Sequence, residues 1–400
     1  MRIGIVALDS RLGVSGGLDI YVRGLVEALA ANGNGHAYTI FTYADKSEHW
    51  KFRDWPEHIR FAAIEPLHAP QSLITRGWRR LQRSLDIAAS KESGDDYLSK
   101  QIDALGLDLL HYPRTILYPS AVRTPCVLSF FDMQHEYYPE FFTDEQIQHR
   151  NALFRPSVNR AVHIAAPSAY TKATLMEKYG VDSGKVTVIP VGLSEDFVRA
   201  DHDAVDEIRN RYNLPQTYVF YPANPWPHKN HARLMAALRI LRERYGQKPA
   251  LILSGRLEQA PINLRWLAIA ADIVDQVIDL GFVAYADLPA LYSGAVCMVF
   301  PSLFEGFGIP LVEAMACGCP IVAAKSSSIP ECVQDAALLF DPLDPSALAD
   351  GLYRLLHDDD LRTQLIKRGY RRSLNYGWQN IVPKLVEIYE HAIPCPPGEL

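Results

Sequence analysis

Short apolar runs rich in β-branched residues alternate with helical patterns along the chain, and this alternation limits the folds that the chain can adopt. Helical patterns at Leu18–Asn32 and Tyr170–Tyr179 fall between several of the runs. Alternation of this kind predicts βαβ units around a parallel sheet whose two faces are covered by helices. The expected strands of the first half are Arg2–Leu8, Tyr38–Thr42, Leu107–Tyr112, Cys126–Phe130, Val162–Ala166 and Val186–Pro190.

The same alternation begins again after residue 214. The expected strands there are Tyr218–Tyr221, Ala250–Ser254, Gln276–Asp279, Cys297–Phe300, Pro320–Ala323 and Ala337–Phe340. The expected helices are His231–Tyr245, Asp287–Ser293, Ile309–Ala316, Pro345–His357 and Asp359–Asn375. Two such patterns in one chain predict an α/β protein with two doubly wound, Rossmann-like domains that face a central cleft. Ligands of such sheets gather at the carboxyl ends of the strands.

A linker rich in glycine, serine and charges separates the two halves. It falls in Val191–Asp206, after the strand that ends at Pro190. We therefore expect a first domain over 1–195 and a second over 196–375. The amphipathic pattern Trp378–His391 predicts a last helix, about 376–393, that packs back on the first domain, although Pro383 lies inside it.

Composition and charge indicate which classes of partner the protein can bind and in which cellular compartment it is expected. Lys and Arg number 40 against 46 Asp and Glu, a net charge of −6, which argues against nucleic-acid binding. The six cysteines include no CxxC pair, so buried free thiols in a reducing cytosol are expected. The opening MRIGIVALDS has too short an apolar run for a signal peptide or a membrane span. A cytoplasmic protein is therefore the expectation.

An arginine-rich amphipathic pattern lies between residues 66 and 105. Arg76, Arg79, Arg80 and Arg83 alternate there with apolar residues, which predicts a helix with one basic side. That side is either a solvated face of the first domain or a contact for an anionic membrane or a lipid-linked acceptor. In the second case the protein would sit peripherally on the inner face of the membrane.

Glycines precede the first helical pattern. Gly13, Gly16 and Gly17 stand between the first strand and a helix that begins near Leu18. Glycine lets backbone N–H groups approach an anion at a helix N-terminus, so a phosphate site is one reading. The spacing is neither G-x-G-x-x-G nor a P-loop, and a plain strand-to-helix turn fits equally well.

Two cations follow strands of the second half. Lys229 lies in YPANPWPHKNHARL, between an expected strand and an expected helix, and Arg256 follows the next strand in SGR. Both would stand at strand carboxyl ends, where a cation can neutralise a diphosphate leaving group. The alternative is an ordinary surface charge at each position.

The stretch PSLFEGFGIPLVEAMACG, residues 301–318, keeps two carboxylates in an otherwise apolar segment. Pro310 predicts the start of a helix, which puts Glu313 in the first turn and Glu305 in the loop before it. Gly306 and Gly308 make that loop flexible, and the backbone amides of residues 307–309 would be free to bind. Glu313 could simply stabilise the helix dipole, whereas Glu305 has no such explanation.

Here the sequence resembles a known family. PSLFEGFGIPLVEAMACGCPIVAA, followed by SSSIPECVQDAALLFDPLDP, is similar to the donor-binding signature of glycosyltransferase family 4, also called glycosyl transferases group 1. These are retaining enzymes with the GT-B fold, and mannosyltransferases are among the members that this chain resembles. The E-x7-E pair is matched by Glu305 and Glu313. The weaker matches are the glycine turn at 16–17, PHKN at 227–230, LGFV at 280–283 and the helix led by Trp378.

The resemblance implies roles for the donor-side residues. Glu313 would bind the ribose hydroxyls of a nucleotide sugar, Glu305 the hydroxyls of the transferred sugar, and Lys229 the diphosphate. The further implied donor contacts are Gly16, Gly17, backbone near Phe282 and Val283, and the amides of Phe307, Gly308 and Ile309. Many members carry an arginine five or six residues before the lysine, where this chain has Ala223 and Asn224. Arg256 is the candidate that would share the phosphate charge.

The segment SFFDMQHEYYPEFF, residues 129–142, resembles the acceptor-side loop of the family. Many members read His-Asp where this chain has Phe131–Asp132. His135 lies three residues further on, and a short turn could bring it into the cleft. We predict Asp132 and His135 as active-site residues beside Glu305, the alternative being a purely structural loop.

The expected activity is the transfer of a hexose from a nucleotide sugar, GDP-mannose or a UDP-sugar, to a glycan or lipid-linked acceptor. The resemblance implies retention by a front-face reaction that needs neither a metal nor a cofactor. Two alternatives stay open at this point. One is an epimerase or hydrolase of nucleotide sugars on the same fold, and the other is a non-catalytic protein that binds sugar nucleotides.

Overall fold

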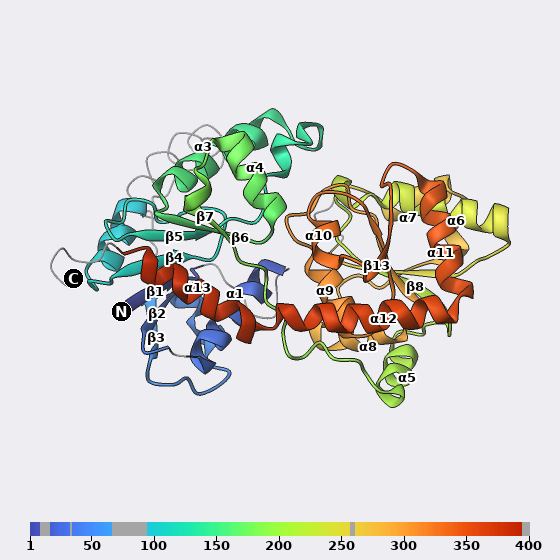
Figure 1. Ribbon diagram of the computed structural model, residues 1–400, viewed down its shortest axis with the longest axis horizontal. Helices are drawn as coiled ribbons and strands as arrows, with labels where there is room; N and C mark the ends of the chain where they lie inside the picture. Colours follow the sequence, from blue (N-terminus) through green and yellow to red (C-terminus); the bar gives the residue numbers. More distant parts are fainter. Residues whose placement is uncertain (9–16, 33, 66–93, 257–260, 394–400) are drawn as a thin grey trace, which may run out of the picture.

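The structure, a computed structural model, describes residues 1–8, 17–32, 34–65, 94–256 and 261–393. They form two lobes, each built around one parallel sheet with helices packed against it (Figure 1). The chain passes from the first lobe to the second after the last strand of the first sheet, and its final helix returns to the first lobe. The predicted α/β class with two doubly wound sheets is therefore confirmed.

In the described part of the chain, seven strands form the first sheet, in the order β3-β2-β1-β4-β5-β6-β7. Their bounds are β1 Arg2–Val6, β2 Ala37–Tyr43, β3 Ile59–Ile64, β4 Leu109–Tyr112, β5 Cys126–Ser129, β6 His163–Ala166 and β7 Val186–Val188. Only β3 is absent from the predicted strands. It is one of the two edge strands, and four of its six positions are exposed or half-buried, so it lacks a continuous apolar run.

The described helices of the first domain are α1 Gly17–Ala31, α3 Asp144–Arg160 and α4 Ala169–Tyr179, with residues 94–103 also helical. Helix α3 is absent from the predicted elements because it is largely polar and contains Pro156. Its start nevertheless carries a local signal. The Thr143 side chain accepts from the Gln146 amide while the Gln146 side chain accepts from the Thr143 amide, which is a capping box.

The second sheet has six strands among the described residues, in the order β10-β9-β8-β11-β12-β13, and each of them matches a predicted strand. Their bounds are β8 Tyr218–Pro222, β9 Ala250–Ser254, β10 Val277–Asp279, β11 Cys297–Phe300, β12 Ile321–Ala324 and β13 Ala337–Phe340. The helices are α5 His202–Arg211, α6 His231–Tyr245, α7 Leu264–Ala270, α8 Leu288–Gly294, α9 Ile309–Ala316, α10 Ile329–Val333, α11 Pro345–His357 and α12 Asp359–Ser373. Strands of this sheet read as short apolar runs because both faces are covered.

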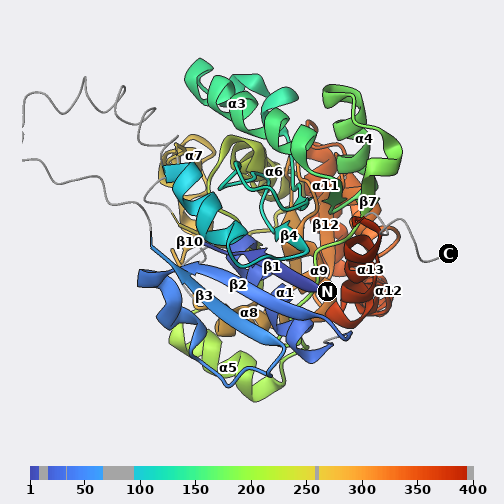
Figure 2. The same cartoon turned by 90° about the vertical axis from the view of Figure 1, so that its left-hand side faces the viewer.

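The last helix, α13 (Trp378–His391), packs against α1 of the first domain (Figure 1). Figure 2 looks onto the first lobe, with β1 to β3 in front of the second lobe. At the start of α13 the Trp378 indole fills the space beside two glycines. A Cβ atom added at Gly24 would lie 2.5 Å from that ring, and one added at Gly192 would lie 2.2 Å from it. These glycines therefore permit the return of the chain.

A Gly192→Ala variant should unfold at lower denaturant concentration than wild type. The new methyl group would push the Trp378 ring away, and overpacking of this kind costs about 1–3 kcal/mol. The measurement is the free energy of unfolding from a urea titration. Gly94→Ala is the matched control, because among the described residues its added Cβ meets only the Tyr118 hydroxyl, at 3.9 Å. Equal stability of the two variants would contradict the tight packing at Trp378.

A buried polar chain also joins α13 to the first sheet. The Tyr389 hydroxyl lies 2.7 Å from Nδ1 of His111, whose Nε2 lies 2.8 Å from Oγ of Ser129. That hydroxyl lies 3.0 Å from the Tyr21 hydroxyl on α1. Burial lowers the pKa of His111 to about 3, so its ring stays neutral and serves as both donor and acceptor. The chain is therefore an element of domain docking.

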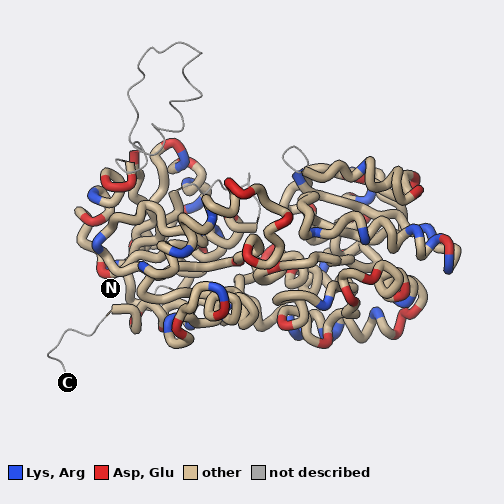
Figure 3. Tube along the Cα trace, turned by 90° about the horizontal axis from the view of Figure 1, so that it is seen from above, with Lys and Arg blue, Asp and Glu red and all other residues tan. Residues whose placement is uncertain are grey.

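Acidic and basic residues are interspersed over both lobes in the described part of the chain (Figure 3). Cys126, Cys297, Cys317, Cys319 and Cys332 are free and buried, as expected, and Cys395 lies outside the described residues. Within the described ranges, none of the helices is both long and apolar enough to cross a membrane. The predicted basic helix at Arg76–Arg83 lies outside the described residues.

Candidate functional site

A cavity of about 600 Å³ lies between the two domains. Its wall from the first domain includes α1 and the loop after β5, and its wall from the second domain includes loops at the carboxyl ends of β8, β9 and β11. The predicted residues that line it are Gly17, Asp132, Lys229, Arg256, Phe282, Val283, Glu305, Phe307, Gly308, Ile309 and Glu313. Cavities at this edge of doubly wound sheets are the usual ligand sites of such folds.

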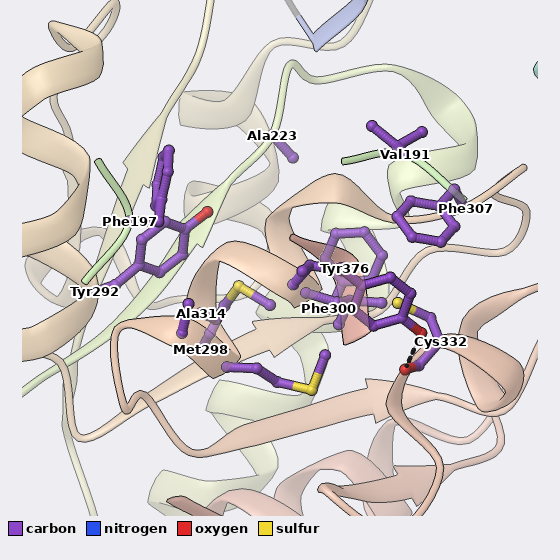
Figure 4. Packing of buried hydrophobic residues seen from close by; sticks show 14 of the residues in the cluster. Val191, Phe197, Ala223, Tyr292, Met298, Phe300, Phe307, Ala314, Cys332 and Tyr376 are labelled. Carbon is purple, nitrogen blue, oxygen red and sulfur yellow. Dashed lines mark hydrogen bonds between the residues drawn. The ribbon is translucent and has the colours of Figure 1, made fainter. Parts of the chain in front are cut away.

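The loop before α9 is shaped by glycine and fixed by the core. Gly308 caps the helix with φ 107°, a conformation that favours glycine. Pro310 is therefore the second helical residue, and Glu313 lies in the second turn of α9, one turn later than predicted. Figure 4 shows Phe307 beside Tyr376, with ring centroids 5.4 Å apart. The Tyr376 hydroxyl donates to the Cys332 carbonyl at 3.0 Å, which fixes the ring that supports the loop.

Glu313 is a buried carboxyl group at the cavity wall. Glu313 is only 5% exposed, and its Oε2 accepts a hydrogen bond of 2.8 Å from the Tyr292 hydroxyl. Desolvation raises its pKa to about 7, and the bond from Tyr292 opposes that rise. A carboxylate that lacks full solvation is well suited to accept hydrogen bonds from a diol such as ribose.

Lys229 and Glu305 meet in the cavity although they come from different loops. Lys229 ends a short 3₁₀ turn, Pro227–Lys229, after β8, and its Nζ lies 2.5 Å from Oε1 of Glu305. Both side chains are mostly buried, at 19% and 13% exposure. The backbone of Glu305 is held as well, since its amide donates to Oγ of Ser327 at 2.9 Å. The lysine ammonium is therefore positioned by the same carboxylate that the family signature contains.

Arg256 lies beside Phe282, whose backbone is predicted to contact the base of the nucleotide sugar. Its guanidinium carbon is 4.9 Å from the centroid of the Phe282 ring, and that ring is 58% exposed. The Arg256 amide donates to Oδ1 of Asn224 at 2.6 Å. Asn224 thus stands where family members carry an arginine, but its side chain binds the neighbouring loop. The guanidinium lies over the Phe282 ring, and the exposed part of this aromatic residue could stack against a planar base.

The structure places the two residues predicted on the acceptor side, Asp132 and His135, in different surroundings. Asp132 lines the cavity, and its Oδ1 accepts from the Gln134 amide at 3.2 Å. His135 does not line it, so the expected turn into the cleft is wrong. The centroid of the His135 ring lies 5.3 Å from that of Phe154 in the apolar core of the first domain, and His135 is 2% exposed. Burial lowers the pKa of His135, which disfavours its charged form.

Of the glycines predicted to form a turn before the first helix, the structure describes Gly17. Gly17 begins α1, and a Cβ added there would lie 3.1 Å from the Ile309 side chain across the cavity. A larger residue at this position would press against the Ile309 side chain where the two domains approach each other. Gly13 and Gly16 lie outside the described residues. Among the described residues, no group of three or more His, Cys, Asp or Glu side chains could hold a metal ion.

Asp19 and Trp226 are two of the cavity residues that the sequence patterns did not reveal. Asp19 on α1 is buried, and its Oδ1 pairs with the guanidinium of Arg114 at 3.1 Å. Trp226 lines the cavity three residues before Lys229 and is 41% exposed. The signal that could have found Trp226 is its place in the same loop as the lysine. Asp19 had no such signal, because its partner comes from a distant loop.

Two family models match the chain. One, described as glycosyl transferases group 1, matches residues 205–372, and the other, described as glycosyltransferase family 4, matches residues 15–197. The chain belongs to glycosyltransferase family 4. The resemblance seen at Glu305 and Glu313 is thereby confirmed, and so is the predicted enzyme class, a glycosyltransferase.

Curated relatives of this family 4 glycosyltransferase include bacterial enzymes. The O-antigen chain mannosyltransferase B of Escherichia coli is 28% identical over 265 residues, which are 66% of this chain and 70% of that protein. The D-inositol 3-phosphate glycosyltransferase of Salinispora tropica is 32% identical over 258 residues, which are 59% of this chain and 52% of that protein. The match thus spans about half the length of the second relative.

Solved structures show the fold of this family 4 glycosyltransferase. Sucrose-phosphate synthase from Thermosynechococcus elongatus aligns over 98% of both chains with a TM-score of 0.75 and 22% identity. The Anabaena protein HepE, in complex with UDP and glucose, aligns over 98% of this chain and 100% of its own with a TM-score of 0.71 and 18% identity. The GT-B fold is therefore confirmed.

Proposed function

We propose that this family 4 glycosyltransferase moves a hexose, with retention of configuration, from a nucleoside-diphosphate sugar to a hydroxyl of a glycan or lipid-linked acceptor. The reaction would serve polysaccharide or glycoconjugate biosynthesis. One observation carries the proposal, which is that a single cavity brings together the Lys229–Glu305 pair and the buried Glu313. The two carboxylates lie on one loop–helix unit, and the cation faces it.

The donor would lie along the wall formed by the second domain. Its base would stack near Phe282 and Arg256, and its ribose hydroxyls would donate to Glu313. The Lys229 ammonium has three N–H donors, and those that do not bond to Glu305 would donate to the diphosphate. The N-terminal amides of α9 add positive potential at the same end of the cavity. The sugar would then lie between Glu305 and Asp132.

The chemical step would take place on one face of the sugar. The acceptor oxygen forms a bond to the anomeric carbon while the bond from that carbon to the diphosphate breaks on the same side. The diphosphate takes the bonding electron pair and accepts the proton of the acceptor hydroxyl. Lys229 would stabilise the charge that develops on the leaving group, and Glu305 and Asp132 would orient the sugar.

Mannose is the sugar that we favour. Its support is the name of the Escherichia coli relative, a mannosyltransferase, and GDP-mannose is the matching donor. The Anabaena structure was solved with UDP and glucose, so a UDP-sugar is the second candidate. The acceptor is proposed as a glycan because the relative acts on an O-antigen chain according to its name.

A donor panel should identify the reaction. We expect one of GDP-mannose, UDP-glucose or an ADP-sugar to release its nucleoside diphosphate faster when a glycan acceptor is added. Release without any effect of the acceptor would favour a hydrolase, and conversion of the sugar without release an epimerase. Binding without turnover would favour the non-catalytic protein. Product of inverted configuration at the anomeric carbon would contradict retention.

Removal of divalent metal should leave the rate unchanged. We propose a metal-independent reaction because Lys229 and the α9 amides would supply the positive charge that a metal supplies elsewhere. The measurement is the initial rate after dialysis against EDTA, compared with the rate after Mg²⁺ is restored. A rate that falls with EDTA and recovers with Mg²⁺ would contradict this proposal.

Peripheral contact with an anionic membrane stays a proposal for residues 66–93, which lie outside the described residues. Its support is the arginine-rich pattern at Arg76–Arg83 alone. Co-sedimentation with anionic liposomes should then weaken as salt is raised.

A further inference from the structure

The first domain holds the loop that carries Glu305. The carbonyl oxygen of Gly306 accepts hydrogen bonds from Oγ of Ser168 at 2.7 Å and from Oγ1 of Thr171 at 3.1 Å. Both donors lie at the N-terminus of α4. A Cβ added at Gly306 would lie 1.9 Å from the carbonyl oxygen of Phe131, so the two domains touch backbone to backbone here. The first domain therefore fixes Gly306, the residue after Glu305, by direct contacts.

A carboxylate of the second domain binds the same helix end. Oε1 of Glu331 accepts from the Ala169 amide at 2.8 Å, and Oε2 accepts from the Tyr170 amide at 3.2 Å. Amides at a helix N-terminus have no partner within the helix and carry partial positive charge, so a carboxylate is the favoured acceptor. Glu331 does not line the cavity and is half-buried.

Glu331 is tied to the Glu305 loop through its own helix. It lies on α10, which follows Ser327 and Ser328 directly. Ser327 accepts from the Glu305 amide, and Oγ of Ser328 donates to the Glu305 carbonyl at 2.9 Å. On the other side, the guanidinium of Arg372 donates to the Glu331 carbonyl at 2.9 Å and so fixes α10. Movement of Glu331 would therefore be passed to the loop of Glu305.

We propose that Glu331 is a positioning residue that fastens the first domain onto the Glu305 loop. Its carboxylate and the α4 amides come from different domains, so the bonds exist only when the domains are closed as in this structure. In this closed arrangement Asp132 lies against Gly306, the residue after Glu305, and both domains contribute to the cavity wall. The inference rests on the proposed transferase function, since it names how donor and acceptor sides are brought together for that reaction.

The test removes the contact from each side. Glu331→Ala removes the acceptor, and Ala169→Pro removes the first amide donor. Proline suits this position because Ala169 is the first residue of α4 and Ser168 before it is extended, at φ −152° and ψ 159°. Asp144→Pro, at the first position of α3, is the matched control, since that helix end makes no described contact with the second domain.

We expect each variant to lower kcat roughly tenfold or more while the donor dissociation constant and the melting temperature change little. The double variant should lose no more than Glu331→Ala alone, because both changes break one contact. Asp144→Pro should keep the wild-type kcat. In small-angle X-ray scattering, both Glu331→Ala and Ala169→Pro should increase the radius of gyration of the protein without added donor, because the contact that they remove is already present in this structure.

Several results would overturn the proposal. One is an unchanged kcat in Ala169→Pro, and another is a double variant whose loss equals the product of the single losses. A Glu331→Ala variant that weakens donor binding as much as it lowers kcat would place Glu331 on the donor instead. If no donor is turned over by wild type, the transferase proposal fails, whereas the scattering comparison still decides whether Glu331 holds the domains together.

Discussion

A Lys229→Met variant should turn over the nucleotide sugar about 10²- to 10³-fold more slowly than wild type, with a much smaller change in KM. The loss is large because Lys229 would stabilise charge that exists only as the diphosphate departs, and loss of one such donor costs this much in other enzymes. Its Nζ is held 2.5 Å from Glu305, so the cation is already in place before the step begins. The measurement is the steady-state rate of nucleoside diphosphate release.

A second variant separates the loss of the cation from the effect on its partner. Lys229→Met leaves the mostly buried Glu305 without its counter-ion, which has a cost of its own. The double variant Lys229→Met with Glu305→Gln removes that cost, and we expect its kcat to stay low. Lys229→Arg keeps the charge and should retain more activity than Lys229→Met. A loss below tenfold in Lys229→Met would mean that another group, such as Arg256, neutralises the diphosphate.

Affinity for the nucleotide sugar should fall about tenfold between pH 8 and pH 6. The pKa of Glu313 is raised to about 7 by burial, so its ribose-binding carboxylate is mostly ionised at pH 8 and mostly protonated at pH 6. An intact nucleotide sugar is the suitable ligand, because its diphosphate does not titrate in this range. Isothermal titration calorimetry at several pH values measures the dissociation constant.

Two variants test the assignment of this pH dependence to Glu313. Glu313→Gln should bind the donor roughly 10- to 100-fold more weakly at pH 8 and lose most of the pH dependence. Tyr292→Phe removes the hydrogen bond that opposes the rise in the pKa of Glu313, so the midpoint should move to higher pH. A pH profile that is unchanged in Glu313→Gln would contradict the ribose assignment.

The same raised pKa has a consequence for stability. An acid whose pKa is higher in the folded state than in the unfolded state loses stability as pH rises between the two values, here from about 4.5 to about 7. Glu313→Gln should therefore gain stability relative to wild type at pH 8 but not at pH 4, by up to about 3 kcal/mol. The free energy of unfolding measured at both pH values checks the sign.

Local patterns predicted the elements well and the site in part. The alternation of strands and helices was readable because each buried strand is a short apolar run and each helix a longer amphipathic one. The edge strand β3 and the polar helix α3 escaped because neither buries a continuous apolar face. Among the candidate residues, Asp132 lies in the cavity while His135, three residues away, packs in the core. The packing of Phe154 decides that difference, and spacing alone could not reveal it.

Local sequence patterns were enough to predict the two α/β domains, a helix start near Pro310 and the two carboxylates, Glu305 and Glu313, around it. These features depend on neighbouring residues and on backbone preferences. The packing of distant segments, in contrast, decided that Lys229 pairs with a carboxylate 76 residues away and that Glu313 is desolvated. It also decided that Glu331 binds α4 of the other domain. Each of these depends on how distant segments pack, because distance and solvent exclusion set the strength of an interaction between charges.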